Sequence, residues 1–250
     1  MKKRSGRGPG HSDFHRPVVW ITGASRGIGE EIAHQFASIG CIVCLSGRTT
    51  AQLQRVAREI HGRGGIAEVI PCDVSKTQSV FSAFRSIEKK RGPVDVLVCN
   101  AGVTTFQSFL ETPMDVYDDI IDTNLRGHIV CVKAVLPSMV KRKRGWIFNI
   151  SSNAAVKTFP GASAYSTTKA GLLAMMKVLR EEVKRHNVKV INVLPGPTET
   201  EMWSRQSRRK FSSRMMRARS VAEVVLSAFL APEDVVIDEL ILRPVLGDIE

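Results

Sequence analysis

The sequence predicts an α/β protein built on a doubly wound parallel sheet of about seven strands, with helices on both faces and three layers in all. Short apolar runs such as Val18–Thr22 lack polar alternation, so they fit strands that are covered on both faces. Stretches such as 28–39 carry apolar residues at helical spacing and separate these runs. This alternation is typical of parallel sheets with helical crossovers. At 250 residues and 43% hydrophobic content, the chain suffices for one core, and we expect a single domain over residues 17–250.

The individual elements follow from where each pattern begins and ends. Strands are expected at 18–22, 41–45, 66–72, 94–99, 145–151, 188–194 and 235–242. Helices are expected at 28–39, 51–61, 78–89 and 114–140, from about 162 onward, and at about 220–230. From residue 18 to residue 99 the expected strands and helices alternate strictly, which gives a βαβαβ arrangement. The long helices at 114–140 and from 162 carry more Val, Leu and Met than one sheet face needs, so we expect a homo-oligomer, a tetramer or a dimer.

Positive charge dominates the chain, with a net charge of +12 and a pI near 9.8. It gathers in a basic arm at 1–16, in the run 141–144 and in the segment 205–219. The arm lacks periodicity and is expected to be disordered, whereas the middle run fits a solvated helix end. No aromatic residues alternate with that run as a base-stacking surface requires, so no nucleic-acid partner is expected. No apolar run is long enough to span a membrane, so we expect no membrane association, no signal peptide and a cytoplasmic location.

The five cysteines lie in apolar runs and fit small core residues of a reducing compartment. Cys41 and Cys44 form a C-x-x-C pair, but at this spacing on a strand their side chains point to opposite faces. No second pair completes a metal site, so no metal is expected.

A glycine-rich turn of sequence TGASRGIG, Thr22 to Gly29, joins the first strand to the first helix. Gly23 permits a sharp turn, Gly27 lets the backbone approach a pyrophosphate, and Gly29 lets the helix pack closely on the strand. The helix N-terminus offers N–H groups and partial positive charge to phosphate oxygens. The turn therefore predicts a dinucleotide site.

The acidic residue that would hold the ribose 2′-hydroxyl of NAD is absent, because no Asp or Glu lies between Glu31 and Glu59. The second strand is followed instead by Gly47 and Arg48. Arg48 and Arg26 offer forked donors to a 2′-phosphate, which a carboxylate would repel. NADP(H) is the expected cofactor, and the alternative is that both arginines are only surface charges.

Tyr165 and Lys169 lie four residues apart at the start of an expected helix, so both project from one face. The ordinary pKa of a phenol is about 10, so Tyr165 needs a neighbouring ammonium to lower that pKa before it can act as a base near neutrality. Ser152 lies at the C-terminal end of the fifth expected strand, where open α/β sheets bind ligands, and its hydroxyl can hold a substrate oxygen.

With these motifs in this order, residues 17 to about 243 resemble the short-chain dehydrogenase/reductase family. The motifs are TGxxxGIG at Thr22 to Gly29, Asp73, the triplet Asn100-Ala101-Gly102, Asn124, Ser152, the Tyr165-x-x-x-Lys169 pair, and Pro195-Gly196 followed by Thr200. The resemblance implies a Rossmann-type fold and an NADPH-dependent carbonyl reductase or alcohol dehydrogenase. Such an enzyme passes a hydride between nicotinamide and the carbon of a ketone, an aldehyde or an alcohol.

The resemblance also implies residue roles. Tyr165 would donate the proton to the carbonyl oxygen and Ser152 would hold that oxygen, while Lys169 would lower the Tyr165 pKa and bind the nicotinamide ribose. Asn124 would hold a water that relays protons to Lys169. The implied cofactor contacts are Gly23, Ser25, Arg26, Gly27, Ile28, Gly29, Arg48, Asp73, Val74, Asn100, Ala101, Gly102, Tyr165, Lys169, Pro195, Gly196 and Thr200.

The sequence departs from the family pattern at two places. Cys99 takes the place of a more usual Asn, which is expected to be harmless at a strand end. The C-terminal run 237–244 lacks the glycine-rich ending of the family's 3-ketoacyl reductases, so that substrate class is in doubt and a general carbonyl reductase is favoured.

The resemblance to the family implies that the segment after Thr200 is the substrate lid. It combines the apolar residues Met202, Trp203, Met215 and Met216 with seven basic residues between 205 and 219. This composition fits an acyl or ring substrate with an anionic group, or a lid that is merely exposed and charged. An alternative function is a non-catalytic NADP-binding sensor, but the complete catalytic set argues against it.

Overall fold

The computed structural model describes residues 16–247 and residue 249. Seven parallel strands form one sheet in the order β3-β2-β1-β4-β5-β6-β9. They are β1 (Val18–Thr22), β2 (Ile42–Ser46), β3 (Ile66–Val69), β4 (Val96–Cys99), β5 (Gly145–Ile150), β6 (Val188–Pro195) and β9 (Glu239–Leu242). The predicted seven-stranded parallel sheet is therefore confirmed. The arm expected at 1–16 lies outside the described residues except for Arg16.

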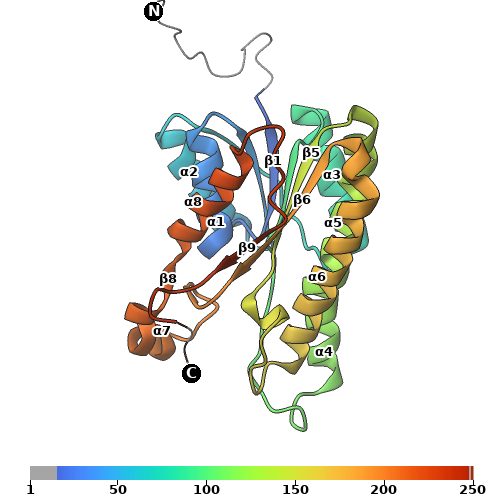
Figure 1. Cartoon of the computed structure of the whole chain (residues 1–250). Coiled ribbons are helices and arrows are strands. Elements are labelled where there is room, and N and C mark those ends of the chain that lie inside the picture. The colour runs from blue at the N-terminus through green and yellow to red at the C-terminus, as the bar shows by residue number, and fades with distance from the viewer. Residues whose placement is uncertain (1–15, 248, 250) are drawn as a thin grey trace, which may run out of the picture.

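Helices cover both faces of the sheet and make three layers (Figure 1). One face carries α1 (Gly27–Ser38), α2 (Thr50–Gly62) and α8 (Ala218–Phe229), and the other carries α3 (Thr77–Arg91), α5 (Gly127–Arg142) and α6 (Ser163–Val183). Cys41 packs in the core of the first face and Cys44 in the core of the second, as their spacing predicted. All five cysteines are buried and free.

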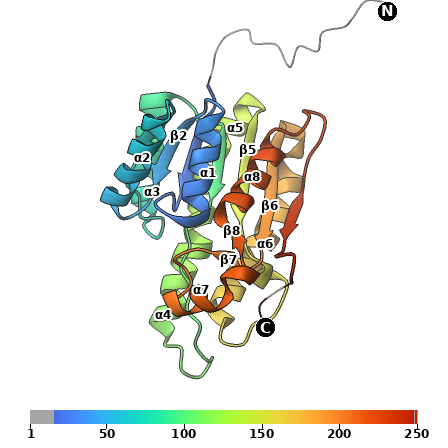
Figure 2. The same ribbon diagram turned by 90° about the vertical axis from the view of Figure 1, so that its left-hand side faces the viewer.

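The order of the strands reverses between β1 and β4, which lie side by side. Open α/β sheets bind ligands at the carboxyl ends of their strands at such a switch point. Helix α4 (Met114–Ile121), helix α7 (Arg205–Phe211) and the two-stranded sheet of β7 (Thr198–Glu199) and β8 (Met216–Arg217) all lie at this end (Figure 2). This small sheet was not expected from the sequence, because two-residue strands leave no periodicity.

The helix predicted at 114–140 is three segments. Between α4 and α5 the chain forms a π-helical turn, η1 (Asp122–Arg126). Short 3₁₀ turns follow at η2 (Asn153–Ala155), η3 (Lys184–His186) and η4 (Ser212–Arg214). A π turn within a longer helix is often found at a functional site, and this one contains Asn124.

The last strand is shorter than predicted. β9 begins at Glu239, and the residues from 235 onward that were expected to be extended precede it as loop. The Lys189 ammonium donates to the carbonyls of Glu233 and Val235 at 3.1 and 2.9 Å and so binds the backbone there. Those carbonyls are thereby satisfied outside the sheet.

The basic run 141–144 is not only a solvated helix end. The Arg142 guanidinium donates to the carboxylate of buried Asp95 at 2.8 Å and to the carbonyl of Val94 at 2.7 Å. The second Asp95 oxygen accepts the backbone N–H of Val18 at 3.0 Å. Arg142 therefore compensates the buried charge of Asp95, because a charge in a low-dielectric interior needs a partner of opposite sign.

Among the described residues, no helix has the length and apolar character needed to cross a bilayer.

Candidate functional site

A pocket of about 410 Å³ opens at the carboxyl ends of β1, β4, β5 and β6. It gathers segments far apart in the sequence. Of the predicted site residues, its lining includes Gly23, Ser25, Arg26, Gly27, Ile28, Arg48, Asp73, Val74, Asn100, Ala101, Gly102, Ser152, Tyr165, Lys169, Pro195, Gly196 and Thr200. Gly29 and Asn124 do not line it.

The glycine-rich turn is held against the segment that follows β4. A Cβ on Gly23 would lie 2.8 Å from the Asn100 side chain and from the Ala101 backbone, and Gly23 also has a φ of +67°. A Cβ on Gly29 would lie 2.4 Å from the same Asn100 side chain, so Gly29 acts in packing beneath the pocket and not in its wall. A larger residue at either position would push the turn away from β4.

Asn100 and Thr22 lock this arrangement by hydrogen bonds. The Asn100 side-chain amide donates to the carbonyls of Thr22 and Gly23 at 3.0 Å each. The Thr22 hydroxyl accepts the backbone N–H groups of Asn100 and Ala101 and donates to the Val98 carbonyl. Sequence reasoning treated Thr22 only as part of the motif, whereas the structure makes it the link between β1 and β4.

One end of the pocket is lined by Arg26 and Arg48, and both side chains are exposed. Thr49 and Gln52 line it too, and neither was singled out from the sequence. Both lie at the start of α2, whose first residue is Thr50. Two guanidinium groups beside a helix N-terminus form an environment that favours an anion.

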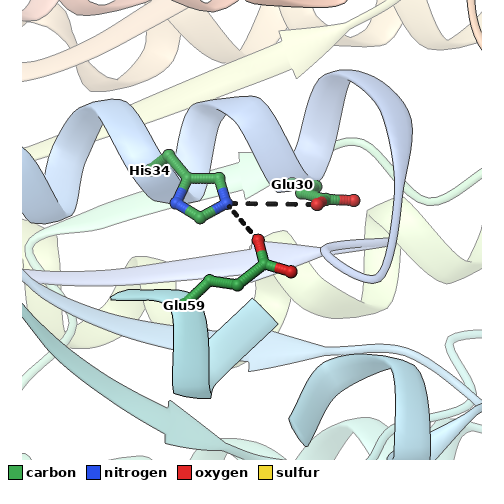
Figure 3. Close-up of side chains that lie close together, drawn as sticks. All are labelled: Glu30, His34 and Glu59. Carbon is green, nitrogen blue, oxygen red and sulfur yellow. Dashed lines mark ion pairs between the residues drawn. The ribbon is translucent and has the colours of Figure 1, made fainter. Parts of the chain in front are cut away.

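Behind this end, an ion-pair network joins α1, α2 and the glycine-rich turn. Arg55 donates to both carboxylate oxygens of Glu30 and to Glu59, at 2.8 Å each, and to the Ser25 carbonyl at 3.2 Å. His34 lies 3.4 Å from Glu59 and 4.0 Å from Glu30 (Figure 3).

The three side chains drawn in Figure 3 have the composition of a metal-ligand set, and their ligand atoms lie within 4.8 Å of one another. Both carboxylates are already bound by the Arg55 cation, which would repel a second cation at the same oxygens. We therefore interpret the network as structural: it holds the glycine-rich turn in place through the hydrogen bond from Arg55 to the Ser25 carbonyl.

At the chemical end of the pocket, Ser152, Tyr165 and Lys169 converge. Ser152 follows β5, and its hydroxyl accepts the backbone N–H of Ala154 at 3.1 Å and is hydrogen-bonded to the Tyr165 hydroxyl. Tyr165 and Lys169 lie on the first turns of α6, and the Lys169 ammonium lies 5.6 Å from the centroid of the Tyr165 ring. All three side chains are buried.

The pKa of Tyr165 departs from the sequence-based expectation. Burial raises the pKa of Tyr165 above its usual value, and the Ser152 hydrogen bond lowers it by less. The Lys169 ammonium lies 5.6 Å from the centroid of the Tyr165 ring and donates to the Ile150 carbonyl at 2.9 Å. Burial also lowers the pKa of Lys169 to about 8. The phenol is therefore protonated near neutrality, which suits a proton donor.

Asn124 lies behind the pocket wall, fully buried in the π turn η1. Its side-chain oxygen accepts the N–H of Val103 and its side-chain nitrogen donates to the Val103 carbonyl, both at 2.8 Å. The nitrogen also lies 3.4 Å from the Thr168 hydroxyl. The Asn124 side chain thus fixes the segment after Gly102.

His128 is a buried polar residue that the sequence analysis did not single out. It is fully buried on α5, and its Nε2 lies 2.7 Å from the Ala101 carbonyl. Burial, helped by the charge of Lys169, lowers the pKa of His128 to about 3, so the ring stays neutral and donates through Nε2. Its position inside an apolar helical pattern gave no signal, because only the tertiary structure places it beneath Ala101.

The basic lid lies apart from this pocket. None of the seven basic residues between 205 and 219 lines the pocket that holds Tyr165. Arg205, Arg209 and Lys210 line a separate shallow hollow on α7 with Gln206. The structure therefore does not support the option of an anionic substrate held by this lid.

Comparison with known proteins agrees with this geometry. The family model of short chain dehydrogenases matches residues 17–210. A sepiapterin reductase from Chlorobaculum tepidum is 32% identical over 240 residues, which cover 93% of this chain and 98% of that protein.

Two solved structures are similar in fold as well as sequence. An alcohol dehydrogenase from the archaeon Thermococcus sibiricus, complexed with 5-hydroxy-NADP, has a TM-score of 0.86 and 29% identity over 94% of this chain and 99% of its own. A metagenomic short-chain oxidoreductase in complex with NADP has a TM-score of 0.82 and 33% identity over 91% and 97%. The chain belongs to the short-chain dehydrogenase family.

Proposed function

We propose that this chain is an NADPH-dependent carbonyl reductase that converts a ketone or an aldehyde to an alcohol and can also run in the reverse direction. The observation that carries the proposal is the convergence of Ser152, Tyr165 and Lys169 in the same pocket as the glycine-rich turn. The nucleotide complexes of the similar solved structures support NADP as the cofactor.

The residues present fit a dinucleotide phosphate. Gly27 has a φ of +60°, and a Cβ there would lie 3.1 Å from the Thr200 side chain, so glycine permits the close approach of the turn and Thr200, both of which line the pocket. Gly27 and Thr200 would hold the pyrophosphate end, and Arg48, Arg26 and the start of α2 would hold the 2′-phosphate. When bound, NADPH supplies the hydride for the carbonyl carbon.

The chain's own residues would handle the oxygen and the proton. The Ser152 hydroxyl would hold the carbonyl oxygen within reach of Tyr165, and preorganised donors of this kind stabilise the charge that develops there. Protonated Tyr165 would give its proton to that oxygen. Lys169 would bind the nicotinamide ribose, and Asn124 would keep the backbone of Val103 in place beside it.

The first test measures whether the purified protein consumes NADPH with a panel of ketones and aldehydes. The absorbance of the reduced nicotinamide reports the NADPH that remains. A carbonyl reductase consumes NADPH in proportion to the alcohol formed. A non-catalytic sensor binds NADPH without consuming it with any carbonyl compound, and that result would overturn the proposal.

The pH dependence gives a separate prediction. Burial lowers the pKa of Lys169 to about 8 and raises that of Tyr165, so on raising the pH Lys169 loses its proton first. We expect kcat/KM for NADPH to fall as the pH rises through about 8, because kcat/KM reports the ionisation of the free enzyme. A profile that stays flat up to about pH 10 would exclude a role for the Lys169 charge.

The homo-oligomer expected from the sequence stays a proposal. Large exposed apolar side chains near the start of α4, namely Phe109, Leu110 and Met114, are consistent with it.

A further inference from the structure

Two aromatic rings stack at the substrate end of the pocket. Phe106 lies on the loop after β4 and Trp203 on the segment between β7 and α7, and both line the pocket that holds Tyr165. Their centroids are 6.1 Å apart and their planes differ by 27°. Phe106 is nonetheless 59% exposed. Aromatic side chains so placed offer a flat face to another ring.

Backbone hydrogen bonds tie both rings to the catalytic side of the pocket. The N–H of Gln107, next to Phe106, donates to the carbonyl of Gly161 at 2.9 Å, and Gly161 lies just before α6, which carries Tyr165. The N–H of Trp203 donates to the Thr200 carbonyl at 3.1 Å. The rings are therefore positioned by the same segments that position the reacting groups.

The polarity of this end favours a neutral ligand. Phe159 and Met202 extend the apolar lining beside the two rings. Of the cations in the lining, Arg26 and Arg48 lie at the nucleotide end, and Lys169 donates to the Ile150 carbonyl.

We infer that the Phe106–Trp203 pair selects substrates whose carbonyl is attached to a neutral aromatic ring. The inference rests on the proposed reductase function and names its substrate class. The substrate ring stacks on the pair while its carbonyl oxygen reaches Ser152 and Tyr165. Reduction of the aryl ketone yields the secondary alcohol, with hydride from NADPH to carbon and the proton from Tyr165 to oxygen.

The test compares acetophenone with cyclohexyl methyl ketone, which has the same carbon skeleton but a saturated ring. For each enzyme the measured quantity is the ratio of the two kcat/KM values, so that the intrinsic reactivity of each ketone cancels between variants. Trp203→Leu and Phe106→Leu should each lower the aryl preference by about 3- to 10-fold, as expected for loss of one aromatic contact. The loss should lie mainly in KM.

Two matched variants serve as controls. Trp203→Phe keeps a ring and should retain the ratio within about twofold, which is within the range of a weak contact. Phe109→Leu removes an exposed ring only three residues from Phe106, but Phe109 does not line the pocket, so the ratio should not change. If both leucine variants lower the rates with the two ketones equally, the rings are merely structural and the inference is wrong.

A binding measurement separates failure of this inference from failure of the proposed function. Calorimetry with NADP⁺ and each ketone allows no turnover, since both reactants are already oxidised. Preference for acetophenone that Trp203→Leu abolishes supports the ring site even if NADPH is never consumed. Equal affinity for both ketones in the wild type overturns the ring site even if both are reduced.

Discussion

Replacement of Tyr165 by Phe is expected to lower kcat for carbonyl reduction by about 10²- to 10⁴-fold, the range of a positioned general acid. The phenol is hydrogen-bonded to Ser152 in a buried site, and its raised pKa keeps the proton available near neutrality. The substitution removes one hydroxyl and no carbon, so the packing of α6 is kept. The affinity for NADPH should stay within a few-fold, because the hydroxyl acts on the substrate.

The chain offers a matched control, since its second tyrosine is Tyr117. The Tyr117 hydroxyl lies 2.6 Å from the Ser163 hydroxyl, also on α6, and does not line the pocket. Tyr117→Phe removes the same atom and should leave kcat within a few-fold. Retention of more than a few per cent of the wild-type kcat by Tyr165→Phe would contradict the proton-donor role.

The choice of cofactor should change at two neighbouring positions after β2. We expect the wild type to prefer NADPH over NADH by at least about tenfold in kcat/KM, or about 1.4 kcal/mol. Arg48→Ala should lower that preference by about 1.5 to 3 kcal/mol, the range of a hydrogen bond to a charged group. Arg58→Ala, an equal loss of charge from an exposed position on α2, should leave it nearly unchanged.

Gly47→Asp should reduce NADPH use sharply while sparing or improving NADH use, because the carboxylate would face the 2′-phosphate. The site accepts a side chain, since a Cβ on Gly47 would lie 3.5 Å from Leu53 and 3.8 Å from the Ser25 hydroxyl, both ordinary contacts. The kinetics of both cofactors with one ketone decide the matter. If the wild type uses both equally and Arg48→Ala changes neither, Arg48 is only a surface residue.

Much of the fold and of the catalytic set could be predicted from local pattern. Unbroken apolar runs identify strands covered on both faces, and spacing alone places Cys41 and Cys44 on opposite faces of the sheet. The four-residue separation of Tyr165 and Lys169 places both on one helix face. Each of these features depends on the repeat of a strand or of a helix, so residues close together in the sequence suffice to predict it.

The tertiary structure decided what depends on burial and on contacts between distant segments. The pKa of Tyr165 rises because surrounding elements bury its side chain. The side chain of Asn124 is hydrogen-bonded to the backbone of Val103, and the Arg142 guanidinium compensates the buried charge of Asp95, forty-seven residues away in the sequence. The basic residues after 204 lie off the pocket, whereas Phe106 and Trp203 meet across two loops. Desolvation and Coulomb energies depend on three-dimensional distances. No period along the chain encodes those distances, so only the folded molecule shows which predicted groups act together.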